Sequence, residues 1–129
     1  MSGYIAVDLD GTLAEYFGFG DGSIGKPIPA MMARIHKWLA EGKEVKIFTA
    51  RVTAEEQRPV VQAWLDEHGI GHLEITNVKT FACLEIWDDR AVRVMPNTGE
   101  PCCYYERVSF TKNAKEIEVE QMLRERGLL

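Results

Sequence analysis

Residues 4–12 read YIAVDLDGT, a short apolar run that carries one aspartate near its end and a second aspartate two residues later. An apolar run of this length is typical of a strand covered on both faces, as strands in parallel sheets are. Residues two apart in a strand point to the same side, so Asp8 and Asp10 would place two negative charges together where the strand ends. The pair therefore predicts a bound cation.

Apolar residues at helical spacing predict helices in the rest of the chain. The first spans residues 30–41 and the second residues 53–68, each followed by a glycine that suits a helix end. Pro59 would clash inside a regular helix, so the second helix is expected to begin irregularly and to become regular near Pro59. A final helix is predicted over residues 114–126.

Further apolar runs predict strands between and after these helices. One begins at Glu44 (EVKIFTA), a short one covers residues 72–76, and a fourth begins at Leu84 (LEIWDD). A weaker strand is predicted over residues 92–95, and residues 102–110 suit an added strand or hairpin. Strands that alternate with helices at this spacing predict an α/β domain with a mainly parallel sheet, which binds ligands at the carboxyl ends of its strands.

The chain length of 129 residues predicts one domain with one hydrophobic core. Within residues 1–129, the glycine-rich segment 14–28 is expected to form a flap after the first strand. Residues 96–129 form a C-terminal extension whose role the sequence leaves open.

The fourth predicted strand also ends in two carboxylates, Asp88 and Asp89. If it lies beside the first strand in a parallel sheet, all four acids meet at one edge. Oxygen ligands with retained waters are what Mg²⁺ prefers, whereas thiolate and imidazole ligands would indicate zinc. Mg²⁺ is the expected cofactor.

Two other predicted strands end in groups that bind anions. Thr49 and Arg51 follow the second strand, and Lys79 follows the third. A hydroxyl, a guanidinium and an ammonium opposite a carboxylate-bound metal suit a phosphoryl group, which carries charge on several oxygens. The predicted reaction class is phosphoryl transfer.

These residues resemble the four motifs of the haloacid dehalogenase (HAD) superfamily of phosphohydrolases. The match is DLDGT for the first motif, Thr49 in IFTAR for the second, Lys79 for the third and WDD for the fourth, and it covers the chain from about Tyr4 to Asp89. The resemblance implies a three-layer α/β/α Rossmann-like core. It also implies the minimally capped type, because the flap leaves no room for a cap domain.

The resemblance implies a role for each acid. Asp8 would be the nucleophile that becomes an aspartyl phosphate, and Asp10 would protonate the leaving group and then activate water. The Asp8 carboxylate, the Asp10 main-chain carbonyl and one acid of the fourth motif would hold Mg²⁺. Asp89 is favoured as the direct ligand with Asp88 holding a coordinated water, and the reverse arrangement stays open.

The resemblance also implies how the substrate is held. Thr49 and Lys79 would grip the phosphoryl oxygens, with Lys79 offsetting negative charge around Asp8. Gly11 would give a tight turn, and Thr12 would orient the loop. The implied substrate-binding residues are Gly11, Thr12, Ala50 and Arg51.

The stretches TAR and DDR, which contain Arg51 and Arg90, further resemble the phosphatase domain of polynucleotide kinase-phosphatase and some deoxynucleotidases. This resemblance implies a small phosphorylated substrate, either a nucleotide or the terminal phosphate of a nucleic acid. The net charge of -5 argues against binding to a long strand.

Two other functions stay open. The same residues would serve a phosphotransferase that passes the phosphoryl group to an acceptor other than water, or a non-catalytic phosphate-binding or regulatory module. Single residues have structural alternatives too, because Thr49 suits a helix cap and Arg51 and Lys79 suit solvated surface charges.

The sequence predicts a cytoplasmic protein. No apolar run approaches the roughly 20 residues of a membrane helix, and no basic segment followed by an apolar one marks the N-terminus. Cys83, Cys102 and Cys103 lack the Cys-x-x-Cys spacing of a zinc site and are expected to be ordinary thiols.

Overall fold

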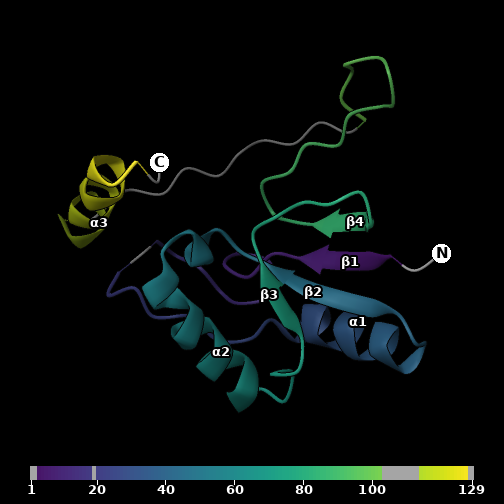
Figure 1. Cartoon of the computed structure of the whole chain (residues 1–129), viewed down its shortest axis with the longest axis horizontal. Coiled ribbons are helices and arrows are strands. Elements are labelled where there is room, and N and C mark those ends of the chain that lie inside the picture. The colour runs from purple at the N-terminus through teal and green to yellow at the C-terminus, as the bar shows by residue number, and fades with distance from the viewer. Residues whose placement is uncertain (1–2, 19, 103–113, 128–129) are drawn as a thin grey trace.

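The computed structural model describes residues 3–18, 20–102 and 114–127, arranged as Figure 1 shows. The strands of this part form one sheet in which every pair is parallel. Its order is β3-β2-β1-β4. The strands are β1 (Tyr4–Val7), β2 (Glu44–Phe48), β3 (Glu74–Thr76) and β4 (Cys83–Trp87). The α/β prediction with a parallel sheet is therefore confirmed.

The register of the sheet aligns the ends of its inner strands. Val7, the last residue of β1, lies opposite Ile47 of β2 and opposite Trp87, the last residue of β4. Since the strands are parallel, the segments that follow β1, β2 and β4 leave the sheet at the same edge. Residues far apart in the sequence are thereby brought together.

Helices α1 (Pro29–Ala40) and α2 (Arg58–Glu67) confirm the two predicted central helices. Pro29 lies in the first turn of α1, where a missing amide proton costs nothing. Two short 3₁₀ turns, η1 (Ala50–Thr53) and η2 (Glu55–Gln57), precede α2, and Pro59 lies in its first turn. The expected irregular start is confirmed.

The core lies between the sheet and these two helices, which cover the same face of the sheet in Figure 1. Ile5 and Val7 of β1 point to this face and pack with Ile35 of α1 and Leu65 of α2, all at most 3% exposed. No described helix packs on the opposite face, where Leu84 of β4 is exposed. The expected three-layer arrangement is therefore not confirmed.

The flap (residues 14–28) is held close to the sheet. Ala14 forms isolated bridges with Asp10 and Pro27, and the indole nitrogen of Trp64 in α2 donates to the Gly25 carbonyl at 2.9 Å. These contacts fix both ends of the flap. Gly22, between them, accepts a hydrogen bond from Arg51 at 2.8 Å, which holds this part of the flap beside the segment that follows β2.

The C-terminal extension agrees with the sequence in one element and differs in another. Helix α3 (Ala114–Glu125) confirms the last predicted helix. The predicted strand over residues 92–95 is wrong, because Val94 makes only an isolated bridge with Pro101 on a segment that leaves the sheet. The hairpin suggested for residues 102–110 lies outside the described residues except for Cys102. No described helix is long and apolar enough to cross a membrane.

Candidate active site at the carboxyl edge of the sheet

Three carboxylates meet at the carboxyl edge. Asp8 directly follows β1, and Asp88 and Asp89 directly follow β4, its neighbour in the sheet. Each offers an oxygen, and these oxygens all lie within 4.8 Å of one another. The Asp8 amide donates to the Trp87 carbonyl at 2.9 Å, which ties the two strand ends together. We call Asp8, Asp88 and Asp89 the acid cluster.

The loop after β1 packs closely against Asp89. Thr12 Oγ1 accepts from the Asp89 amide at 3.0 Å and lies 3.1 Å from Asp89 Oδ1 and 3.5 Å from Asp8 Oδ2. Gly11 has φ +88, and a Cβ atom there would lie 2.6 Å from Asp89 Oδ2. Neither Gly11 nor Thr12 lines the cavity described below, and Thr12 contacts Asp89 of the acid cluster. Their role in substrate binding stays a prediction.

Burial and the neighbouring carboxylates make it unfavourable for Asp8 to carry a negative charge. The pKa of Asp8 is raised from 3.8 to about 8, first by burial, then by the negative charge of Asp88 and by the hydrogen bond with Asp89. A hydrogen bond from the Leu9 backbone opposes this shift but is outweighed. A proton or a bound cation would relieve this repulsion.

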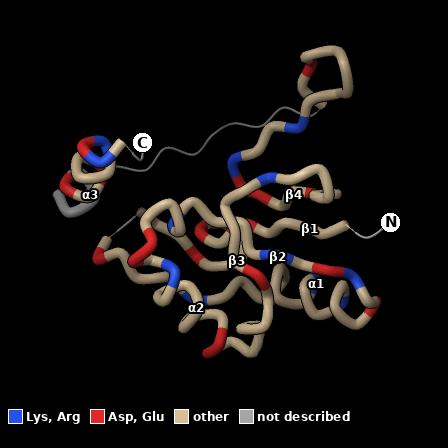
Figure 2. The backbone as a smooth tube through the Cα atoms, in the orientation of Figure 1, with Lys and Arg blue, Asp and Glu red and all other residues tan. Residues whose placement is uncertain are grey.

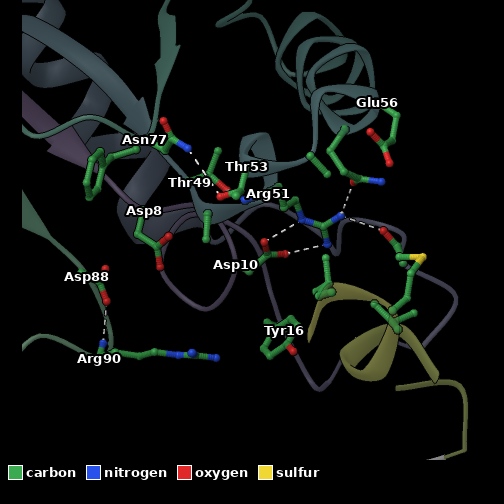
Figure 3. A pocket seen from close by; sticks show the side chains of 18 of the residues that line it. Asp8, Asp10, Tyr16, Thr49, Arg51, Thr53, Glu56, Asn77, Asp88 and Arg90 are labelled. Atoms are coloured by element: carbon green, nitrogen blue, oxygen red, sulfur yellow. Dashed lines mark hydrogen bonds and ion pairs between the residues drawn. The ribbon is translucent and has the colours of Figure 1, made fainter. Parts of the chain in front are cut away.

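Asp10 does not belong to the acid cluster, which corrects the expected convergence of all four carboxylates. Its Oδ2 accepts from Arg51 Nε at 2.7 Å and its Oδ1 from Arg51 Nη2 at 2.9 Å, a two-pronged ion pair visible in Figure 3. The strand ends at Val7, so the two-residue alternation that would align Asp10 with Asp8 does not continue that far. Asp10 instead lies in the turn that leads to the flap.

Thr49 follows β2 and is 2% exposed. Its Oγ1 accepts from the Arg51 amide at 3.2 Å and caps η1, and its own amide donates to the Thr76 carbonyl at 3.0 Å. Thr49 and Ala50 both line the cavity. Thr49 therefore caps η1 and also lines the cavity.

Lys79 does not join the site, although the third motif led us to expect it there. Its side chain is exposed and does not line the cavity. Thr80 bonds to the hydroxyl of Tyr4, the first residue of β1, so the chain has left the carboxyl edge soon after β3. Asn77 lines the cavity from this segment instead.

A cavity of about 620 Å³ opens beside Asp8, Asp10 and Asp88. Sequence reasoning missed much of its lining, which comes from the flap, the two 3₁₀ turns and α3. The lining residues that it missed include Tyr16, Gly22, Gln57, Asn77, Val119, Met122 and Leu123. The helical pattern of α3 could be recognised, but no signal in it indicates contact with the cavity.

Charge around the site is mixed. Arg90 lines the cavity, and its amide donates to Asp88 Oδ1 at 2.7 Å. Figure 2 shows acidic and basic residues interspersed along the described backbone, with no continuous basic stripe on it. The site therefore offers local positive charge within an acidic chain.

Comparison with known proteins gives no match to a protein-family model, to a curated protein or to a solved structure. The likeness to the HAD superfamily rests on the four motifs alone.

Proposed function

We propose that this chain is a Mg²⁺-dependent phosphomonoester hydrolase of the HAD type, with Asp8 as its nucleophile. The observation that carries the proposal is the acid cluster, in which oxygens from three carboxylates gather within 4.8 Å beside a cavity. Such crowding raises the pKa of Asp8 to about 8. A group this costly to ionise is typical of functional sites.

The donor set suits a hard divalent cation. All three groups are carboxylates, and the cluster contains neither nitrogen nor sulfur. Asp8 and one of Asp88 and Asp89 would hold Mg²⁺, with the Asp10 main-chain carbonyl as a further ligand by resemblance to the family. When bound, Mg²⁺ would neutralise charge on the phosphoryl oxygens.

In the proposed reaction, a carboxylate oxygen of Asp8 attacks phosphorus and the ester P–O bond breaks. The leaving oxygen takes a proton that Asp10 carries at the start of the cycle, so the alcohol departs neutral and Asp10 becomes the carboxylate that Arg51 holds. Water then attacks the aspartyl phosphate and gives a proton back to Asp10. The bond between phosphorus and Asp8 breaks, which releases inorganic phosphate.

Thr49, which lines the same cavity, supports this reaction. Its hydroxyl already accepts a hydrogen bond from the Arg51 amide, and a hydroxyl that accepts can still donate its own proton. A phosphoryl oxygen in the cavity is a suitable acceptor. Thr49 is thus assigned to hold the transferred group.

The substrate class that we propose is a small nucleotide or the terminal phosphate of a nucleic acid. The motifs TAR and DDR support this class through their resemblance to the phosphatase domain of polynucleotide kinase-phosphatase and to some deoxynucleotidases. Tyr16, Phe48 and Met122 line the cavity with apolar surface, which suits a nucleobase. Arg90 lines the same cavity and supplies positive charge for a phosphate.

The test is turnover of 4-nitrophenyl phosphate by the wild type, with Mg²⁺ and with EDTA, and by Asp8→Asn. We expect activity only in the wild type with Mg²⁺, and a loss of at least about a thousandfold in Asp8→Asn. Asp66→Asn is the matched control, because Asp66 lies exposed on α2 and an asparagine can keep its bond from Gln62. Activity that survives Asp8→Asn would eliminate the aspartyl-phosphate mechanism.

A second measurement separates hydrolysis from the alternatives. Acid-quenched protein should carry a phosphoryl group on Asp8 by mass spectrometry, and the phosphate released should equal the nitrophenol released. A phosphotransferase would instead place phosphate on an added alcohol. A phosphate-binding module would bind inorganic phosphate and release no nitrophenol.

A further inference from the structure

All the N–H donors of the Arg51 guanidinium are engaged inside the protein. Nε and one Nη2 proton bind the two oxygens of Asp10, at 2.7 and 2.9 Å. The second Nη2 proton reaches the Ser23 carbonyl at 3.3 Å, and Nη1 donates to the Gly22 carbonyl at 2.8 Å and to Gln57 Oε1 at 3.1 Å. A guanidinium has about five donors in all, so none remains for a phosphoryl group.

We propose that Arg51 is a positioning residue that fixes the Asp10 carboxylate and clamps the flap, and that it does not bind substrate. The catalytic half of this inference rests on the proposed function, because it concerns Asp10 as the acid and base of that reaction. The clamp itself is a statement about the fold and stands apart from it.

Burial makes this arrangement rigid. The side chain of Arg51 is 6% exposed and that of Asp10 is 21% exposed, so little water competes for the ion pair. The guanidinium is a flat fork that matches a carboxylate in one geometry. Arg51 also lies in η1, which is separated from β2 by Thr49 alone, so it ties Asp10 to the end of a second strand.

The flap depends on the same side chain. Gly20 and Gly22 both have positive φ, and a Cβ atom at either position would meet nothing within 4 Å. This stretch therefore gains little order from side-chain packing of its own. Arg51 holds the carbonyls of Gly22 and Ser23, next to the bond between Trp64 and Gly25. Figure 3 shows the guanidinium beside Asp10.

A positioning role predicts a dependence on the leaving group. Proton donation by Asp10 matters most when the departing oxygen is strongly basic, as in an alkyl phosphate, and least for a nitrophenolate. A loosened Asp10 should therefore slow alkyl esters and spare nitrophenyl esters. A lost phosphate contact should slow all esters equally.

The kinetic experiment measures kcat/KM for aryl and alkyl phosphates with Arg51→Lys, Asp10→Asn and the double variant. We expect Arg51→Lys to lose about 10- to 100-fold on alkyl esters and less than about threefold on 4-nitrophenyl phosphate. The double variant should be no slower than Asp10→Asn, since both changes remove one function. An equal loss on every ester, or additive losses, would overturn the positioning role.

The second experiment needs no turnover. Backbone ¹⁵N relaxation of residues 20–25 is compared among the wild type, Arg51→Lys, Arg51→Gln and the control Arg93→Gln, whose side chain is exposed outside the cavity. In the wild type and the control, order parameters should be about 0.85, and in both Arg51 variants they should fall below about 0.6. Unchanged α1 amides would show that the variants are folded.

The two experiments test separate claims, so one claim can be rejected while the other stands. Flap order parameters that stay high in both folded Arg51 variants would overturn the clamp. A wild type without phosphatase activity would remove the proposed function and leave the relaxation test of the clamp intact.

Discussion

Asp8 and Asp10 are separated by one residue in the sequence, yet they lie in opposite electrostatic surroundings. Asp8 faces Asp88 and Asp89, and its pKa is raised to about 8. Asp10 is held by Arg51 through two short hydrogen bonds. One side of the site thus carries uncompensated negative charge, and the other side is already neutralised by the protein.

Two aspartates in the same short motif can therefore have different roles. Asp8 extends directly from β1 and meets the end of β4, whereas Asp10 lies past the strand and turns to η1. The repulsion at the first position can be relieved by a proton or by a bound cation. The second position has its counter-charge, Arg51, within the protein.

The largest expected effect is a difference in sign between two matched variants. With EDTA near pH 8, where Asp8 is half ionised, Asp8→Asn should raise the free energy of unfolding by about 2 to 4 kcal/mol, because it removes a crowded charge. Asp10→Asn should lower it by about 2 to 3 kcal/mol, because it weakens a mostly buried ion pair. Urea unfolding measures both. If both variants changed the free energy of unfolding in the same direction, the contrast between Asp8 and Asp10 would be wrong.

Mg²⁺ should stabilise the wild type at the acid cluster. At a concentration of about 100 times Kd, it should add about 2.7 kcal/mol to the free energy of unfolding. Asp8→Asn and Asp89→Asn should lose most of this gain, and Asp10→Asn should keep it because its main-chain carbonyl is unchanged. Calorimetric titration with MgCl₂ gives Kd for each protein. Equal Mg²⁺ affinity in all four would place the ion elsewhere.

The pH dependence of the free energy of unfolding should reflect the ionisation of Asp8. Between the ordinary value of 3.8 and the raised pKa of about 8, the folded state keeps a proton that the unfolded state has lost. The free energy of unfolding should therefore fall as pH rises through this window, by at most about 1.4 kcal/mol per pH unit. Asp8→Asn should remove this component, and saturating Mg²⁺ should reduce it. Identical pH profiles for wild type and Asp8→Asn without metal would contradict the raised pKa.

The smallest expected effect concerns Thr12. Thr12→Val removes the bonds to the Asp89 amide and carboxylate and should cost about 1 kcal/mol in stability. It should also weaken Mg²⁺ binding by about 10- to 100-fold, because Asp89 loses its support. Thr98→Val is the matched control, since the Thr98 hydroxyl also gives one hydrogen bond and receives one from an amide. Equal Mg²⁺ affinity in both variants would remove Thr12 from the metal's surroundings.

Much of the fold could be predicted from short-range patterns. Apolar runs gave β1, β2 and β4, and helical spacing gave α1 and α2, because burial on one face leaves a period in the sequence. The strand over residues 92–95 was wrong because an apolar run alone does not supply a neighbouring strand. The third layer was expected from family likeness, and no described helix fills it.

The site was predictable where parallel strands alone decide it. Asp8, Asp88 and Asp89 meet because β1 and β4 are neighbours whose ends are in register. The partner of Asp10 depends on where β1 stops, and the place of Lys79 depends on how the chain turns after β3. Both are tertiary features that a motif does not encode.

Gly11 links the turn after β1 to the acid cluster. Its φ of +88 is a conformation that L side chains rarely adopt, and a methyl group there would lie 2.6 Å from the Asp89 carboxylate. A larger residue at position 11 would therefore strain the backbone and push the Asp89 side chain out of its present place, so the geometry of the three acids depends on a residue that carries no side chain.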